Sequence, residues 1–347
     1  MTRTILALDG NSVLHRSFHA GARSGYRTPD GRPGWAVRGL LDQMVAAVDR
    51  ARADVVVVGF DDAEESKRRE RWPAYKAQRP DKPHTLVAQL VDAIDVLRAM
   101  GVPVVVPTGL EADDVLAATG RAARAAGWQA VLATSDRDAF ALINDSTRVL
   151  RIINGGVEAS PMLTPERLKL LTGVTPAQYR DLAALRGDPS DNLPGIRGIG
   201  NVLGARLLAE FGSAEALFAD LDDGGDRCRD CAGAAVAKRL ATDEARERWA
   251  LNLALMTPDP TAALAPEVFD SPLPLASKPV RRGFGRYGMS SRTALRVLCR
   301  DEESSSWLPE TEETHPMADP GWRPVSRRGR TFPPLPAKAP LLQDTLF

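Results

Sequence analysis

Four short apolar runs in the first part of this chain each lead to carboxylates. The runs and the acids that follow them are 5–8 with Asp9, 55–60 with Asp61, 102–106 with Glu111, Asp113 and Asp114, and 130–133 with Asp136 and Asp138. These runs lack helical periodicity and are separated by helix-like segments, which is typical of buried parallel strands. The pattern predicts an α/β fold with a central, mostly parallel sheet.

All of these acids are expected at one edge of that sheet. In open α/β sheets the functional groups lie beyond the carboxyl ends of the strands. Two carboxylates ~4 Å apart repel by about 4 kcal/mol at an effective dielectric constant of 20, so such a cluster requires cations. Oxygen ligands without His or Cys suit Mg²⁺ or Mn²⁺. The sequence therefore predicts a multi-carboxylate site for divalent metal ions.

Length and composition restrict the class of protein. The 347 residues suffice for two domains, and a hydrophobic content of 44% is ordinary for a soluble protein. The 45 basic and 45 acidic residues cancel, so a polyanion could be attracted only by local patches, such as those at 67–79 and 278–300. No signal peptide or long apolar run is present, so we expect a cytoplasmic protein without a membrane segment.

Soft metal ligands are few. Cys228 and Cys231 form a CxxC, but a structural zinc site needs four ligands and no second pair follows, so we expect unpaired thiols in a loop. His15 and His19 are four residues apart and could share a metal. Since oxygen ligands are already available, we expect both to be surface or packing residues of a helix.

The segment after residue 160 has helical signals. Thr164 and Thr175 each precede a proline, as N-cap residues do, and helical signals continue to about residue 256. Residues 222–230 are predicted as a turn rich in Gly and Asp. Beyond residue 301 the composition shifts to Ser, Glu, Pro and Arg without apolar periodicity, which indicates disorder.

The acids at 111–114 are the sharpest acidic motif. Glu111 and Asp114 share one face at the start of a predicted helix, with Asp113 nearby, so several oxygens can converge on one ion. The alternative is that acids complement a helix N-terminus, but that effect does not require three of them.

A glycine pattern follows two further acids, Asp188 and Asp191. Gly195, Gly198 and Gly200 lie between two helical segments. Backbone N–H groups in such a turn can face a phosphate, which predicts a helix–hairpin–helix that binds the DNA backbone. A plain glycine-rich turn is the alternative.

The polar segment 64–83 is basic and precedes a predicted helix at 86–100. Its basic side chains can neutralise phosphates, and its aromatic rings can stack on an unpaired base. The residues concerned are Arg68, Trp72, Tyr75, Lys76 and Arg79. A solvated charged helix is the alternative.

Together these motifs resemble the 5′-nuclease family, which includes flap endonucleases, phage 5′-exonucleases and the nuclease domain of bacterial DNA polymerase I. The similarity covers about residues 4–260, through the stretches 8–20, 60–79, 109–116, 135–138 and 187–195. It implies a PIN-like nuclease domain at 1–160 with an arch at about 64–100, a helical subdomain at 161–300 with the hairpin at about 180–211, and a flexible tail at 301–347.

The resemblance implies hydrolysis of DNA phosphodiesters near a 5′ end or at a 5′ flap, by a two-metal mechanism, in primer removal or repair. One ion would be held or oriented by Asp9, Asp61, Glu111, Asp113 and Asp114, and a second by Asp136, Asp138, Asp188 and Asp191. Lys76, Arg79 and Arg68 would act on the scissile phosphate. Arg16, Tyr75, Arg197, Arg206 and the glycines at 195, 198 and 200 would bind DNA, with a potassium ion at the hairpin.

Several features depart from the family pattern. Residues 201–204 offer no cation after the hairpin glycines, so the grip on duplex DNA is expected to rest on Arg197 and Arg206. Asp62 has no assigned role. No polymerase domain follows, and the final Gln343, Leu346 and Phe347 resemble a bacterial sliding-clamp-binding peptide. An unstructured terminus is the alternative reading of that tail.

We therefore expect a monomeric, stand-alone nuclease in a bacterial or phage-like setting, close to the nucleoid. A non-catalytic flap-binding protein is the alternative from another class, but it requires an incomplete acid cluster. An RNA-directed nuclease of the same fold is a further alternative, because no residue reports on recognition of the 2′-hydroxyl.

Overall fold

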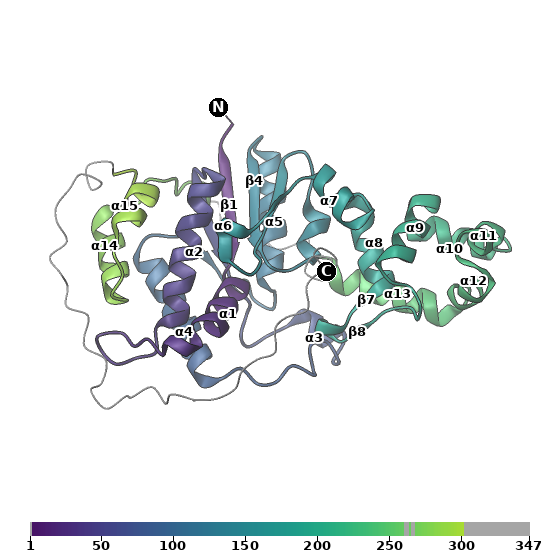
Figure 1. Cartoon of the computed structure of the whole chain (residues 1–347), viewed down its shortest axis with the longest axis horizontal. Helices are drawn as coiled ribbons and strands as arrows, with labels where there is room; N and C mark the ends of the chain where they lie inside the picture. Colours follow the sequence, from purple (N-terminus) through teal and green to yellow (C-terminus); the bar gives the residue numbers. More distant parts are fainter. Residues whose placement is uncertain (1, 260–263, 265–267, 302–347) are drawn as a thin grey trace, which may run out of the picture. The chain divides into compact units, whose positions relative to one another are not determined.

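The computed structural model describes residues 2–259, 264 and 268–301, so the tail residues Gln343, Leu346 and Phe347 lie outside the described residues. A six-stranded sheet with the order β3-β2-β1-β4-β5-β6 forms its centre (Figure 1). The strands are β1 (Thr4–Asp9), β2 (Val55–Gly59), β3 (Val104–Val105), β4 (Gln129–Thr134), β5 (Thr147–Arg151) and β6 (Met162–Leu163). β1 to β5 pair in parallel and β6 is antiparallel, which confirms the predicted mostly parallel sheet.

The predicted strand at 102–106 is much shorter in the structure. Only Val104 and Val105 pair with β2. Pro103 and Pro107 flank this pair, and proline has no N–H to donate to a ladder. The strand therefore ends early, and the following loop leads to the acids at 111–114.

Alternate residues of β1 belong to two separate cores. Ile5 and Ala7 face one core, whereas Leu6 and Leu8 face the other. The Leu6 side is covered by α1 (Gly10–Gly21), α2 (Trp35–Ala51), α4 (His84–Ala99), α14 (Ser277–Arg286) and α15 (Arg292–Leu298). The Ile5 side is covered by α5 (Ala112–Ala125), and its core continues into the helical region that follows β6.

That helical region extends from α7 to α13 (Figure 1). Its helices are α7 (Pro165–Thr172), α8 (Pro176–Arg186), α9 (Asn201–Phe211), α10 (Ala214–Asp222), α11 (Asp226–Ala232), α12 (Ala234–Leu240) and α13 (Asp243–Met256). Thr164 and Thr175 cap α7 and α8, as predicted. The shorter elements are η1 (Ala22–Ser24), α3 (Lys67–Arg71), η2 (Asp138–Leu142), α6 (Gly156–Ala159), β7 (Gly187–Asp188), η3 (Pro189–Asp191) and β8 (Leu193–Pro194). No described helix has the length and apolarity that a bilayer span requires.

The predicted turn at 222–230 is mostly helical. Only residues 223–225 separate α10 from α11, and Cys228 and Cys231 both lie in α11 rather than in a loop. Cys228 is fully buried and Cys231 is half-buried, and both are free thiols. The loop prediction was wrong because the apolar contacts of Cys228 with the core stabilise a short helix here.

The basic stretch at 278–300 is not part of the helical region between α7 and α13. Val280, Phe284 and Leu295 are buried in the core that α2 and α4 share. This placement differs from the predicted assignment of residues up to 300 to the DNA-binding subdomain. The placement differs because α14 has an apolar face, with Val280 and Phe284, that packs into this core. The arginines between these residues obscure that face in the sequence.

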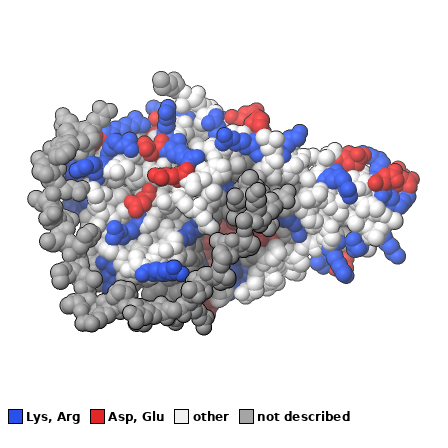
Figure 2. Space-filling model, viewed as in Figure 1, with Lys and Arg blue, Asp and Glu red and all other residues white. Residues whose placement is uncertain are grey.

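Most arginines of that stretch are paired with acids. Arg281, Arg286, Arg296 and Arg300 form ion pairs with Asp301, Asp92, Asp49 and Asp54, at distances of 3.7, 3.8, 3.2 and 3.3 Å. Figure 2 accordingly shows basic and acidic atoms intermixed on the visible face of the molecule. The local excess of positive charge in the sequence is therefore largely compensated in the fold.

Candidate functional site

The carboxyl ends of β1, β2 and β4 meet at one edge of the sheet, and Asp9 lies at its centre. Asp9 is the N-cap of α1; it accepts hydrogen bonds from the Ser12 N–H (2.8 Å) and from the Thr134 hydroxyl (2.7 Å). Burial raises the pKa of Asp9 to about 7; the nearby charges of Asp61 and Asp136 add to this effect, whereas the two hydrogen bonds oppose it. The predicted convergence of strand-end acids is thus present around Asp9.

Asp61, after β2, is held by neutral donors. It accepts hydrogen bonds from the Asn11 side-chain amide (2.8 Å) and the Ala112 N–H (2.9 Å). Burial, followed by the charge of Glu111, raises the pKa of Asp61. Asn11 was not among the residues expected at this site, although its position directly after Asp9-Gly10 is a signal that could have pointed to it.

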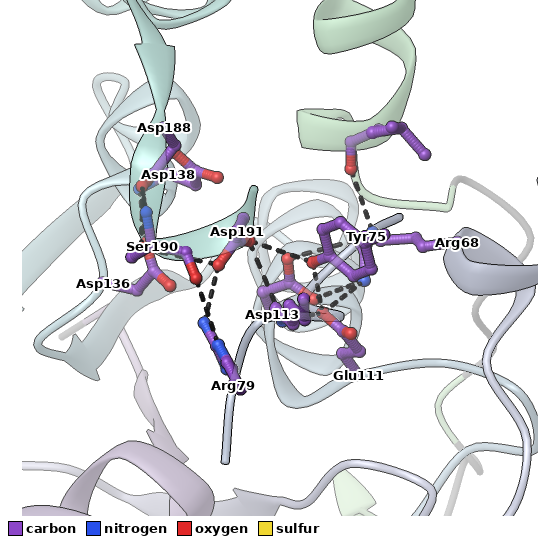
Figure 3. Close-up of polar contacts among 12 residues, drawn as sticks. Arg68, Tyr75, Arg79, Glu111, Asp113, Asp136, Asp138, Asp188, Ser190 and Asp191 are labelled. Carbon is purple, nitrogen blue, oxygen red and sulfur yellow. Dashed lines mark hydrogen bonds and ion pairs between the residues drawn. The ribbon is translucent and has the colours of Figure 1, made fainter. Parts of the chain in front are cut away.

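Glu111, Asp113 and Asp114, which we call the clamped group, are bound together by Arg68 of α3. The Arg68 guanidinium lies 2.9 Å from Glu111, 3.1 Å from Asp113 and 2.9 Å from Asp114, and its Nε donates to the Leu255 carbonyl at 3.0 Å (Figure 3). The arginine thus ties α3, the start of α5 and the end of α13 together. One protein cation therefore already neutralises part of this group.

Asp114 accepts more hydrogen bonds from protein donors than Asp9 or Asp61 does. It is fully buried and accepts hydrogen bonds from the N–H groups of Glu111 (2.9 Å) and Asp259 (2.7 Å), in addition to its contacts with Arg68. The first of these contacts is half of a capping box for α5. The predicted ligand role does not fit this arrangement; Asp114 orients Arg68 and the helix.

Tyr75 is only 3% exposed. Its hydroxyl lies 3.1 Å from a carboxylate oxygen of Glu111 and 3.1 Å from one of Asp191, and the two acceptors share its single proton. Stacking on an unpaired base requires an open ring face, so the predicted stacking role does not fit the structure. Tyr75 instead connects the clamped group to Asp191.

Lys76 and Arg79 also contact these acids. The Lys76 ammonium lies 2.9 Å from Glu111 and 3.9 Å from Asp191, and Arg79, half exposed, lies 2.6 Å from Asp191. Lys76 has a left-handed backbone conformation with φ 55°, and its N–H donates to the Asp191 carbonyl. The structure therefore brings two of the predicted catalytic cations to the site.

Asp136, Asp138 and Asp188 form the second group of acids, which we call the open group. Asp136 accepts from the Asp138 N–H, and Asp188 accepts from the N–H and hydroxyl of Ser190. Within the described residues none of the three forms an ion pair, and the buried Oδ1 of Asp138 has no hydrogen-bond partner. Burial, followed by the charges of Asp136, Asp188 and Asp191, raises the pKa of Asp138 well above its usual range.

The open group has the chemistry that a hard divalent cation requires: carboxylate oxygens outside ion pairs and a buried acceptor without a hydrogen-bond partner. Figure 3 shows it on one side of Asp191 and the clamped group on the other. As they stand, no three His, Cys, Asp or Glu side chains of the described residues have the arrangement of a metal site. The acids therefore share one edge, but their side chains must turn to coordinate an ion.

The predicted helix–hairpin–helix joins α8 to α9. A Cβ on Gly195 would lie 1.7 Å from the Arg186 carbonyl oxygen, so only glycine allows this close approach of the backbone. Gly198 has a φ of 89°, and Gly200 is the N-cap of α9. Arg197 and Arg206 are both exposed beside this turn.

Two further residues named from the sequence, Arg16 and Asp62, have local partners. Arg16 of α1 is half-buried and donates to the Asn154 side chain at 3.0 Å. Asp62 accepts hydrogen bonds from the N–H groups of Gly109 (2.8 Å) and Glu64 (3.0 Å), so it fixes the loops on either side of the site.

His15 is half-buried in α1, and His19, four residues on, is exposed. Burial and then the charge of Lys82 lower the pKa of His15 to about 4. A neutral, half-buried imidazole agrees with the expected packing role.

Two family models match the chain. The N-terminal resolvase-like domain of 5′-3′ exonuclease matches residues 4–170, and the C-terminal SAM fold of 5′-3′ exonuclease matches residues 174–271. DNA polymerase I of Mycobacterium tuberculosis (strain ATCC 25618 / H37Rv) is 36% identical over 248 residues, which are 70% of this chain and 27% of that protein. The thermostable DNA polymerase I of Thermus aquaticus is 36% identical over 218 residues, 63% of this chain and 25% of that protein. The chain therefore spans about a quarter of the length of the curated relatives that it matches.

Solved structures share the fold. The T5 5′-exonuclease with bound divalent zinc ions has a TM-score of 0.58 at 20% identity, covering 73% of this chain and 89% of that chain. The catalytic core of Rad2 in complex with DNA substrate has a TM-score of 0.53 at 16% identity, covering 86% of this chain and 92% of that one. At these identities the likeness concerns the α/β nuclease fold and its SAM-like helical domain.

Proposed function

Because the chain belongs to the 5′-3′ exonuclease family, we propose that it hydrolyses phosphodiester bonds of DNA near 5′ ends or at 5′ flap junctions, in primer removal or repair. The observation that carries this proposal is the edge of the sheet where two groups of carboxylates lie on either side of Asp191 (Figure 3). Its open group forms no ion pair among the described residues, and the buried Oδ1 of Asp138 has no hydrogen-bond partner.

The residues present fit divalent ions, and two Mg²⁺ or Mn²⁺ ions are part of the proposal. Asp136, Asp138, Asp188 and Asp191 would hold one, and Asp9, Asp61, Glu111 and Asp113 the other. When bound, such ions would supply a hydroxide-forming water and stabilise the attacking and leaving oxygens. The donors that now contact Asp9 and Asp61 keep those carboxylates aimed at the edge of the sheet.

Lys76 and Arg79 are proposed to bind the scissile phosphate. Both are tethered beside Asp191 but neither is enclosed on all sides: Lys76 is 18% and Arg79 is 50% exposed at the side chain. A cation so placed can turn from a carboxylate to an incoming phosphate oxygen. Arg68, only 11% exposed and in contact with three acids, is proposed to position the clamped group instead of touching the substrate.

The hairpin between α8 and α9 is proposed to bind the backbone of duplex DNA, with Arg197, Arg206 and, near the sheet, Arg16. Backbone N–H groups at a helix N-terminus favour phosphate because they are uncapped and carry partial positive charge. A potassium ion at this hairpin is carried over from the family resemblance.

Partners and setting are proposals as well. The C-terminal Gln343, Leu346 and Phe347 would bind a bacterial sliding clamp, and the protein would act as a monomer in the cytoplasm. Deleting residues 343–347 should abolish association with the clamp without changing the cleavage of free oligonucleotides. Clamp association that survives the deletion would contradict the tail proposal.

The proposal is tested with a 5′-labelled flap duplex, incubated with Mg²⁺, with Mn²⁺ and with a chelator. We expect metal-dependent products cut at the junction, and Lys76→Ala should slow cleavage more than it weakens binding. Tight flap binding without cleavage would favour the non-catalytic alternative. Faster cleavage of an RNA flap than of the matched DNA flap would favour the RNA-directed alternative.

A further inference from the structure

The hairpin lacks a cation in the residues that directly follow its glycines. Asn201, Val202, Leu203 and Gly204 form the first turn of α9 without a basic side chain. Gly200, the N-cap, provides no side-chain hydrogen bond. The phosphate-facing end of α9 must therefore obtain positive charge from elsewhere in the fold.

Arg239 of α12 reaches this turn. Its Nη2 lies 3.0 Å, and its Cζ 3.7 Å, from the point where a Cβ of residue 198 would be. Ala237 and Leu240 are buried in the core, which fixes α12 and turns the exposed Arg239 outward beside the hairpin. Glycine is favoured at position 198 by its φ of 89°, and the Arg239 guanidinium lies directly beside this turn.

The helical region contains both paired and unpaired arginines. Arg227, Arg229, Arg246 and Arg248 bind Glu210, Asp226, Asp222 and Glu244, whereas Arg197 and Arg206 form no ion pair among the described residues. Among the described residues no hydrogen bond or ion pair involves the side chain of Arg239. An exposed guanidinium beside the turn, without an acidic partner among the described residues, is available for an anion from outside.

The backbone N–H groups of the Gly198 turn complement the positive charge of the Arg239 guanidinium. In the part of the chain that the structure describes, the N–H groups of Arg197, Gly198 and Gly200 have no acceptor. An oxyanion beside Gly198 can accept from such N–H groups and from a guanidinium, whose planar fork matches the geometry of phosphate.

We propose that Arg239 is a DNA-binding residue that grips a backbone phosphate of the duplex together with the Gly198 turn. This inference rests on the proposed function, since it concerns the same DNA substrate. The contact reads no bases, so it strengthens binding of any sequence and leaves the chemical step at the sheet edge unaffected.

The test compares Arg239→Ala and Arg239→Lys with Lys238→Ala, which removes an exposed charge from the same helix. Fluorescence anisotropy with a flap duplex over a range of salt concentrations gives affinity and salt slope, and single-turnover cleavage at saturating DNA gives the chemical rate. For Arg239→Ala we expect affinity about 5- to 10-fold weaker for every sequence, a salt slope smaller by about one, and an unchanged rate at saturation. Arg239→Lys should recover part of the affinity, and Lys238→Ala should lose less than Arg239→Ala.

The inference is overturned if Arg239→Ala retains the affinity and salt slope of the unaltered protein, or if Lys238→Ala loses as much. Circular dichroism of each variant excludes misfolding as the cause of a loss. Failure of the proposed function has a different signature, because the unaltered protein itself would then fail to cut the flap duplex, whether or not it binds the duplex.

Discussion

The clamped group and the open group lie at one edge of the same sheet and differ in their counter-charge. The clamped group, Glu111, Asp113 and Asp114, contacts Arg68, and Lys76 also binds Glu111. The open group, Asp136, Asp138 and Asp188, forms no ion pair within the described residues. The acids of the clamped group thus form ion pairs with protein cations, whereas those of the open group form none among the described residues.

The pKa values of Glu111 and Asp138 follow this difference, whereas burial raises the pKa of the clamped Asp113 well above its usual range despite Arg68. Burial alone would raise the pKa of Glu111, but Lys76 and Arg68 reverse that effect and lower it. Burial and three neighbouring carboxylates raise the pKa of Asp138. We infer that the clamped group contributes to the stability of the metal-free fold, and that the open group recruits the first divalent ion.

The largest expected effect follows from removing a charge of the open group. Asp138→Asn should reduce flap cleavage by about 10³-fold or more, which corresponds to roughly 4 kcal/mol of activation free energy, because it removes a proposed metal ligand. Flap affinity and the folded state should persist. Rapid-quench assays measure the cleavage rate, and thermal unfolding measures the stability of the folded state. Asp145→Asn, at an exposed loop residue, is the control. Near-normal turnover of Asp138→Asn would show that this residue is not a metal ligand.

A loss of stability is expected from the clamped group. Arg68→Ala should lower the free energy of unfolding of the metal-free protein by about 3–5 kcal/mol, because it leaves buried carboxylates without their partner. Lys67→Ala breaks only the exposed pair with Asp259, at 3.4 Å, and should cost less than about 1 kcal/mol. Urea unfolding in the presence of a chelator measures the loss of stability in both variants. Equal losses in Arg68→Ala and Lys67→Ala would mean that Arg68 does not stabilise the clamped group.

Asp9 and Glu111 should contribute opposite pH dependences to the stability of the metal-free protein. The pKa of Asp9 rises from 3.8 to about 7, so the folded state binds the proton more tightly than the unfolded state. Stability of the metal-free protein should therefore fall as the pH rises from about 4 to 7, by no more than about 4 kcal/mol from Asp9. Glu111, whose pKa is lowered, contributes stability above its unfolded pKa that is lost as the pH falls.

Urea unfolding between pH 4 and 8, with chelator and with Mn²⁺, measures that dependence. Divalent ions should flatten the decline, since they replace the protons on buried carboxylates with raised pKa values, Asp9 and Asp138. Metal-free stability that rises steadily from pH 4 to 7 would contradict the raised pKa of Asp9.

The smallest predicted effect is the loss of stability when the Tyr75 hydroxyl, which lies between Glu111 and Asp191, is removed. Tyr75→Phe removes hydrogen bonds to Glu111 and Asp191 and should cost about 1.5–3 kcal/mol of stability, because both acceptors are charged. Tyr26→Phe, whose hydroxyl donates to the neutral Tyr287 carbonyl at 2.7 Å, should cost about 1 kcal/mol. Affinity for an unpaired base should not change in Tyr75→Phe; a change would restore the stacking role.

The sequence predicted the strand-end acids and the hairpin because both follow from local patterns. Apolar runs end at Asp9 and Asp61, and Gly195 and Gly198 are required by the backbone of the turn. It did not predict which acids are neutralised, since Arg68 is distant in sequence from the clamped group that it binds. For the same reason the burial of Tyr75 and the approach of Arg239 to Gly198 became visible only in the fold.

The most direct test of this account is a titration with Mn²⁺ followed by electron paramagnetic resonance, which counts bound ions. We predict that the tightest site is lost in Asp138→Asn and retained in Glu111→Gln. Loss of the tightest site in Glu111→Gln, with the site intact in Asp138→Asn, would contradict the assignment of the first ion to the open group.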